Sequence, residues 1–214
     1  KRLWIQPAAG DAGGALGAAL TAWHALENQS RSVNGTTDYM QGSFLGPSYS
    51  NEEIEEFLRD KEASYQRMNE EKLLDRIAEA LAAGKVVGWF QGRMEFGPRA
   101  LGSRSILGGA RNPKMQSVMN LKIKYRESFR PFAPSVLRER VSDYFELDAD
   151  SPYMLLVAPV REEIRTPEGE SGAAGFERLR GRRSAIPTVT HVDYSARVQT
   201  VDAQRHPLLH RLLT

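Results

Sequence analysis

Hydrophobic residues recur at helical spacing in two acidic segments of the chain. In the segment 69–85 the apolar residues are three or four positions apart, which is typical of an amphipathic helix, and Gly84 provides a stop signal. Ser50 precedes the segment "NEEIEEFLRD" as an N-cap, and acidic residues follow in the first turn, where the helix dipole favours them. The pattern therefore predicts helices over 51–60 and 69–85.

Short apolar runs predict the strands. They are "VVGWF" over 86–90 and "YMLLVAPV" over 153–160. The segment "TVTHVDYSARVQTV", residues 188–201, alternates polar and apolar positions as one strand or as a hairpin bent at Tyr194–Ser195. Because these strands are separated by helical patterns, the chain is expected to adopt an α/β or α+β fold.

Three further segments have the start signals or composition of helices. An alanine-rich helix is expected over 11–28, beginning at Asp11, and another over 112–125, with Pro113 at its first position. A short amphipathic helix is expected over 138–147.

The distribution of small polar and charged residues predicts the domain boundaries. Residues 28–50 are rich in Ser, Asn, Gly and Thr, which favours a linker between an N-terminal piece, 1–27, and a C-terminal domain, 51–214. Residues 161–185 combine many charges with glycine, so we expect a mobile insertion that proteases cleave first.

Composition narrows the class of protein. Of 214 residues, 41% are hydrophobic and none is cysteine, which excludes disulfides, thiolate metal sites and cysteine nucleophiles and fits a reducing cytoplasm. No apolar run approaches the roughly 20 residues that span a bilayer, and no signal peptide is visible. A cytoplasmic globular protein is the expectation.

Positive charge is concentrated in the middle of the chain. The net charge is only +2, yet the segment from Gln91 to Arg140 has eleven Lys and Arg residues and three Glu residues. The rest of the chain is therefore acidic. This asymmetry predicts an anionic ligand for the central segment.

The segment "GRMEFGPRALGSRSIL", residues 92–107, is the strongest candidate for chemistry. Its glycines and proline exclude a helix, and a looping backbone could bring Arg93, Arg99 and Arg104 together around phosphate or carboxylate. Glu95 could neutralise only one of these cations. The alternative is a basic surface loop with structural ion pairs.

Two further segments have polar residues at spacings that could form a site. In "KIKYRESFRPFAP" an extended backbone would place Lys122, Lys124 and Arg126 on one face and direct Ile123 and Tyr125 into the core. Considered apart from the nearby arginine segment, this run is typical of a solvent-exposed protein surface.

In "THVDYSARVQT", alternation would align His191, Asp193, Ser195 and Arg197 on a polar face that could orient a phosphate or transfer a proton. A structural role for His191 stays open, and no Ser–His–Asp triad is indicated.

Four motifs together closely resemble the NodU/CmcH-type O-carbamoyltransferases. They are "QPAAGDAGGALGAAL", "GWFQGRMEFGPRALGSRSIL", "MNLKIKYRESFRPFAPSVL" and "THVDYSARVQT". The resemblance implies an actin-like (Kae1-like) domain, of which residues 1–27 are the end, followed by a YrdC-like α/β domain with a twisted mixed sheet. It also implies that carbamoyl phosphate and ATP form carbamoyl adenylate, whose carbamoyl group passes to a hydroxyl of a small molecule or saccharide.

The resemblance also implies roles for individual residues. Arg93, Arg99 and Arg104 would bind carbamoyl phosphate and the phosphates of ATP. A second group, with Ser135 as a hydrogen-bond donor, would bind the same anions: Lys124, Arg126 and Arg130. His191 and Arg197 would contact the carbamoyl group or the adenylate phosphate. Asp11 matches an aspartate that helps to bind a metal beside the nucleotide.

Two departures from the family pattern limit what is expected of this chain. The histidine pair that would complete the metal site is absent, and the segment expected after "HPLLHRLLT" is absent too. The chain thus resembles a C-terminal piece with an incomplete metal site. Mg²⁺ would accompany ATP, and Fe²⁺ or another divalent ion would bind only in the full-length protein.

Other partners and functions stay open at this point. The missing actin-like domain and a second copy of the chain, as a homodimer, are candidate partners. A nucleic-acid-binding module is an alternative function, because the basic segment could follow a phosphate backbone. A threonylcarbamoyl-adenylate synthase-like enzyme is another, although the long arginine motif argues against it.

Overall fold

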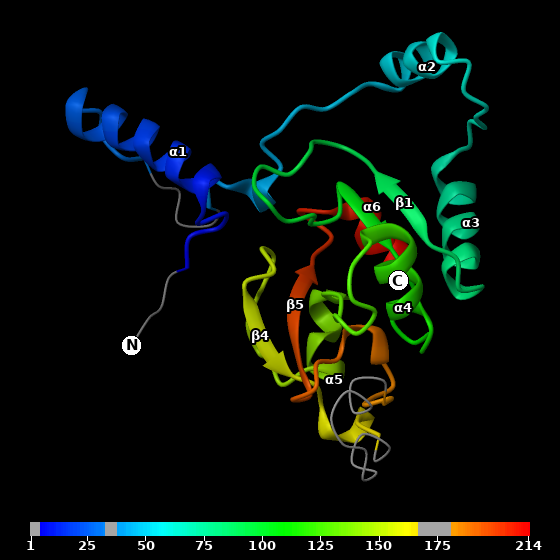
Figure 1. Ribbon diagram of the computed structural model, residues 1–214. Helices are drawn as coiled ribbons and strands as arrows, with labels where there is room; N and C mark the ends of the chain where they lie inside the picture. Colours follow the sequence, from blue (N-terminus) through cyan, green and yellow to red (C-terminus); the bar gives the residue numbers. More distant parts are fainter. Residues whose placement is uncertain (1–4, 33–37, 167–180) are drawn as a thin grey trace. The chain divides into compact units, whose positions relative to one another are not determined.

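The computed structural model describes residues 5–32, 38–166 and 181–214. The chain divides into two compact units, Lys1–Gln66 with Phe90–Ser105, and Arg67–Trp89 with Ile106–Thr214. The chain contains both helices and strands (Figure 1), so the predicted mixed α/β class is confirmed. The assignment of 1–27, 28–50 and 51–214 to separate domains stays a prediction.

The second unit is built on a three-stranded mixed sheet. Its strands are β3 (Ser135–Leu137), β4 (Leu156–Pro159) and β5 (Ser195–Val201), in the order β3–β5–β4. The central strand β5 runs parallel to β3, with Ser135 opposite Gln199. It runs antiparallel to β4, as Figure 1 shows for the yellow and orange arrows. Every residue of β5 from Val198 onward is buried, which suits a central strand.

Apolar side chains pack around this sheet. Val198 and Val160 are fully buried, and Phe145 is 1% exposed at the end of α5 (Val141–Tyr144). A 3₁₀ turn, Arg138–Arg140, leads into α5, so the predicted helix over 138–147 is confirmed in part. Burial of these apolar surfaces is the main favourable contribution to folding of the unit.

Three longer helical segments complete the second unit. Helix α3 (Glu70–Ala82) confirms the predicted helix, and the side chain of Asn69 accepts a hydrogen bond from the Lys72 N–H as its N-cap. Helix α4 (Met115–Met119) continues into a π-helical turn, Asn120–Lys124. Helix α6 (Pro207–Leu213) contacts α3.

The helix predicted from Pro113 begins later than expected, at Met115. The cause is a turn at Asn112, whose side-chain oxygen accepts the N–H of Lys114 at 2.9 Å. An Asn side chain that bonds the backbone two residues on competes with helix formation. Pro113 therefore lies in the turn and not at the first helical position.

The first unit has two helices that match their predictions. Helix α1 (Asp11–Thr21) begins at Asp11 and continues into a π-helical turn, Ala22–Leu26. Helix α2 (Asn51–Asp60) begins with a capping box, in which Ser50 and Glu53 each accept a backbone hydrogen bond from the other. A 3₁₀ turn, Gln41–Ser43, lies between them in the sequence.

Strands β1 (Val87–Phe90) and β2 (Arg104–Leu107) pair in a two-stranded sheet. The strand predicted over 86–90 is confirmed. Residues 91–103, which join the two strands, contain no helix, as their glycines and proline predict.

Two local predictions are wrong. The segment 188–201 is neither one strand nor a hairpin, because β5 begins only at Ser195 and a turn precedes it. In that turn Asp193 accepts hydrogen bonds from both the N–H and the hydroxyl of Ser195. The run from Lys122 to Arg126 is not an extended strand either, because it enters the π-helical turn. Tyr125, with φ 48° and an exposed fraction of 86%, does not face the core.

Residues 167–180 of the predicted insertion lie outside the described residues. The chain on either side of them is held together, since the Thr166 N–H donates to the Arg183 carbonyl at 2.9 Å and Arg165 forms an isolated β-bridge with Ser184. Both Arg183 and Ser184 are buried. Among the described helices, none has the length and apolar character needed to cross a membrane.

Replacing Phe145 by alanine should lower the free energy of unfolding by about 3–5 kcal/mol, because the ring is fully buried and its loss leaves a cavity. Phe57 in α2 is 60% exposed, so Phe57→Ala should change stability by less than about 1 kcal/mol. Urea denaturation of both variants measures the difference. Equal losses would contradict the placement of the core.

Candidate functional site

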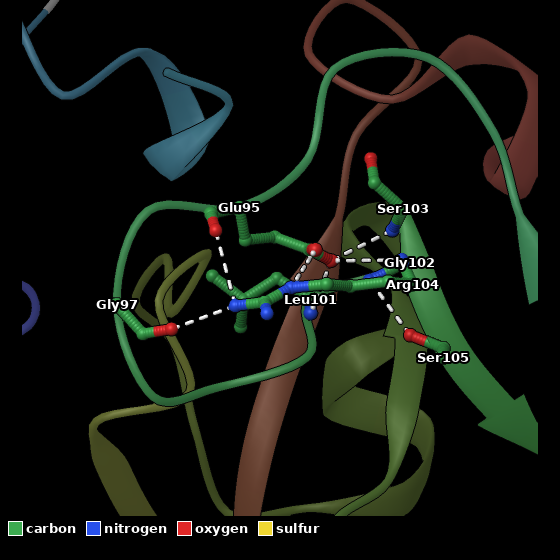
Figure 2. A network of polar contacts seen from close by, with 7 residues as sticks. All are labelled: Glu95, Gly97, Leu101, Gly102, Ser103, Arg104 and Ser105. Atoms are coloured by element: carbon green, nitrogen blue, oxygen red, sulfur yellow. Dashed lines mark hydrogen bonds and ion pairs between the residues drawn. The ribbon is translucent and has the colours of Figure 1, made fainter. Parts of the chain in front are cut away.

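The arginine loop, residues 91–105, is folded around one buried carboxylate. Glu95 is 4% exposed, and its Oε1 accepts hydrogen bonds from the backbone N–H groups of Leu101 and Ser103, both at 2.7 Å. Its Oε2 lies 3.1 Å from Nε of Arg104 (Figure 2). Because a buried charge is stable only when it is paired and hydrogen-bonded, this set of donors fixes the loop.

Arg104 spans the same loop with its guanidinium group. Its Nη2 donates to the carbonyl oxygens of Glu95 at 3.0 Å and Gly97 at 2.7 Å (Figure 2). Gly97 and Gly102 have φ values of 115° and 113°, which other residues adopt only with strain. The glycines therefore let the backbone turn around Glu95 and Arg104.

The ionised form of Glu95 is favoured. Burial alone would raise the pKa of this carboxyl group, but the N–H groups of Ser103 and Leu101 outweigh burial and hold the pKa below its usual value. The carboxylate thus binds the backbone N–H groups of Leu101 and Ser103.

Arg93 is also bonded to the protein itself. Its Nε donates to the Gly46 carbonyl at 3.0 Å and its Nη2 to the Leu45 carbonyl at 3.1 Å. The Phe96 N–H donates to the carbonyl of Ser43. Segment 43–47 is therefore hydrogen-bonded to the start of the arginine loop.

Arg99 is in a different situation from the other two arginines. Its side chain is half-buried, and it forms no hydrogen bond or ion pair with the residues that the structure describes. Two of the three arginines in the motif thus have structural contacts, as the alternative interpretation of the sequence allowed.

A second loop in the other unit, the basic loop of residues 122–130, is held by Asn120. Asn120 is fully buried, and its Nδ2 donates to the carbonyls of Ser128 at 3.1 Å and Arg130 at 2.8 Å. Its Oδ1 accepts from Nε of Arg126 at 2.6 Å. Sequence reasoning missed Asn120, although an Asn just before a run of cations was visible.

The basic loop concentrates positive charge. Burial lowers the pKa of Arg126, and the nearby charge of Arg130 lowers it further, while Glu127 acts in the opposite direction. Glu127 lies 3.9 Å from Arg130, and both side chains are exposed, so this pair is weak. Lys124 is exposed at the end of the π-helical turn.

The remaining predicted site residues of this unit lie on or next to β5. Ser135 donates its hydroxyl to Oε1 of Gln199 at 2.8 Å across the β3–β5 pair. Arg197 is exposed on β5, where it is opposite Val157. His191 is exposed in the turn before the strand, and its backbone N–H donates to the carbonyl of Ser195.

Asp11 is exposed at the first residue of α1. No group of three or more His, Cys, Asp or Glu side chains within 5–32, 38–166 and 181–214 is placed to hold a metal ion. One exposed carboxylate binds a divalent ion weakly, because such ions need several oxygen ligands. The described residues therefore do not form a metal centre by themselves.

Glu95→Gln should lower the free energy of unfolding by about 1.5–3 kcal/mol at neutral pH, because the new amide N–H₂ faces hydrogen-bond donors. The pKa of Glu95 is lowered in the folded state, so its contribution is present above the unfolded pKa and is lost as the pH falls through the folded pKa. Urea denaturation along a descending pH series should show wild type and variant converging. Glu127→Gln, at an exposed carboxylate, is the control, and the same convergence in that variant would contradict the role of Glu95.

Residues 78–214 match the family model described as the carbamoyltransferase C-terminus. An uncharacterised protein of Synechocystis is 60% identical over 218 aligned residues, which cover 100% of this chain and 35% of that protein. Nodulation protein NolO of Bradyrhizobium diazoefficiens is 36% identical, over 96% of this chain and 34% of its own. A 3'-hydroxymethylcephem-O-carbamoyltransferase of Streptomyces clavuligerus is 42% identical, over 64% of this chain and 22% of its own.

The chain spans about a third or less of the length of these relatives. The matched residues include β1, the whole arginine loop, β2, the basic loop and the three-stranded sheet. On this match and these identities, the chain belongs to the carbamoyltransferase C-terminal family.

Proposed function

We propose that the chain is the part of an ATP-dependent O-carbamoyltransferase that binds carbamoyl phosphate and ATP and forms carbamoyl adenylate. Family membership supports this proposal, and so does the Streptomyces relative, which is named a 3'-hydroxymethylcephem-O-carbamoyltransferase. In the same proposal the mixed sheet is the core of a YrdC-like domain, and residues 1–27 are the end of an actin-like domain.

The observation that carries the proposal is the pair of guanidinium groups in the basic loop. Arg130 is exposed, and Arg126 is bonded within the described residues through Nε alone among its three guanidinium nitrogens. Guanidinium nitrogens that the protein leaves unbonded can bind an anionic ligand. Phosphate suits guanidinium because two parallel hydrogen bonds can form.

The reaction that we propose balances as follows. Water cleaves the bond between phosphate and the carbamoyl group, which releases inorganic phosphate and carbamate. A carbamate oxygen then attacks the α-phosphorus of ATP and expels pyrophosphate, which leaves carbamoyl adenylate. In the second step a hydroxyl oxygen of a small molecule or saccharide attacks the carbamoyl carbon, and AMP leaves.

The cations have an electrostatic role in this scheme. Carbamoyl phosphate and ATP repel each other, and fixed guanidinium groups offset this repulsion without rearranging during the reaction. We propose Arg126, Arg130 and Lys124 as phosphate ligands on the basic loop, and Arg99 on the arginine loop. His191 and Arg197 are proposed contacts of the carbamoyl group or of the adenylate phosphate.

Millimolar carbamoyl phosphate with ATP should raise the melting temperature of the 214-residue chain by several degrees. Ligand at about 100 times its Kd stabilises a folded protein by about 2.7 kcal/mol. Differential scanning fluorimetry with each ligand separately and together tests this expectation. Stabilisation by DNA or RNA and not by these ligands would support a nucleic-acid-binding module instead.

Arg126→Ala and Arg130→Ala should each weaken binding of carbamoyl phosphate by about tenfold or more, because a hydrogen bond to a charged group is lost. Isothermal titration calorimetry gives the Kd. The matched control is Arg138→Ala, because Arg138 is an exposed arginine of the same basic segment whose Nε is paired with Asp150. An unchanged Kd in both site variants would refute their assignment as ligands.

A further inference from the structure

Both polar atoms of the Asn120 side chain form hydrogen bonds to one loop. Nδ2 donates to the carbonyls of Ser128 and Arg130, and Oδ1 accepts from Nε of Arg126 at 2.6 Å. Its own backbone carbonyl accepts the N–H of Arg126 at 3.1 Å. One buried amide thus fixes both the middle and the end of the basic loop.

The position of Asn120 is itself fixed by the core. It follows α4, in which Met115 and Met119 are buried, at the point where the α-helix changes into the π-helical turn. Such turns are rare and recur at functional sites. Because an amide buried in apolar surroundings must keep its partners, Asn120 cannot move without a cost in free energy.

The bond from Asn120 determines how Arg126 presents its charge. The guanidinium group is fixed at Nε by Oδ1 of Asn120, and its Cζ lies 4.9 Å from the centre of the Phe132 ring. The two Nη groups form no hydrogen bond or ion pair with residues in the described ranges. They are the pair of donors that bind phosphate side by side.

We infer that Asn120 is a positioning residue, which holds the guanidinium group of Arg126 in the orientation that binds the phosphate of carbamoyl phosphate. This inference rests on the proposed function. Asn120 itself does not touch the ligand, so its effect on affinity passes entirely through Arg126. Loss of an ordinary structural residue would lower stability, but its effect on the Kd would not depend on the presence of Arg126.

The test measures the Kd of carbamoyl phosphate by calorimetry in the 214-residue chain. Asn120→Ala should weaken binding by about tenfold, because the charge-assisted hydrogen bond that orients Arg126 is lost. Gln116→Ala is the matched control, because Nε2 of Gln116 donates to the Phe129 carbonyl of the same loop at 2.6 Å and Gln116 does not bond Arg126. Its Kd should stay within about twofold of wild type.

A double-mutant cycle separates positioning from general damage. In the Arg126→Ala background, Asn120→Ala should have no further effect on the Kd. An equal tenfold loss in that background, or an unchanged Kd in Asn120→Ala alone, would overturn the inference while the proposed function stands. No binding by the wild-type chain would overturn both.

A second variant covers the case in which Asn120→Ala does not fold. Phe132→Leu keeps an apolar side chain but removes the ring beneath Arg126. It should raise the Kd of carbamoyl phosphate a few-fold in the wild-type background and leave the Kd unchanged in the Arg126→Ala background. The same loss in both backgrounds would count against a fixed orientation of Arg126.

Discussion

A guanidinium group cannot lose its charge inside a protein, so each arginine of these loops needs an oxygen acceptor or a ligand. In the arginine loop the acceptor is the carboxylate of Glu95, to which the backbone also turns its N–H groups. In the basic loop it is the amide oxygen of Asn120. Both loops are irregular in backbone, and each is fixed by a single buried polar side chain.

This constraint sorts the arginines by role. Arg93 and Arg104 donate to oxygens of the chain, and their hydrogen bonds hold the loop on which Arg99 lies. In Arg126 the Nε atom is bonded to Asn120, and the two Nη atoms form no bond with the described residues. A motif rich in arginine therefore uses part of its charge to hold its own backbone.

Several regular elements could be predicted from the sequence because their signals are local, whereas β2 and α6 were not predicted. The N-caps Ser50 and Asn69 and the apolar run before Phe90 determine their elements over a few residues. The turn at Asp193 and the π-helical turn at Asn120 could not be predicted, because side-chain bonds and tertiary contacts override the alternation of polar and apolar residues there.

The sequence predicted the residue types of the candidate site but not their contacts. It grouped Arg93, Arg99 and Arg104 together as ligands, and only the contacts distinguish Arg99 from the other two. Glu95 was visible as the one acid among these arginines and Asn120 as an Asn before a run of cations, but neither residue type indicates which atoms it bonds. The role of Asn120 depends on hydrogen bonds to the carbonyls of Ser128 and Arg130, which lie near Asn120 only once the loop has folded.

The order of the strands has a consequence for how the protein is made. Among the described strands of this sheet, the central strand β5 comes last in the sequence, and its parallel partner β3 is encoded about sixty residues earlier. Until β5 leaves the ribosome, β3 and β4 have no strand between them and expose unpaired edges. Chaperone protection of the nascent chain would matter most during this interval, and slow translation shortly before β5 would lengthen the exposure.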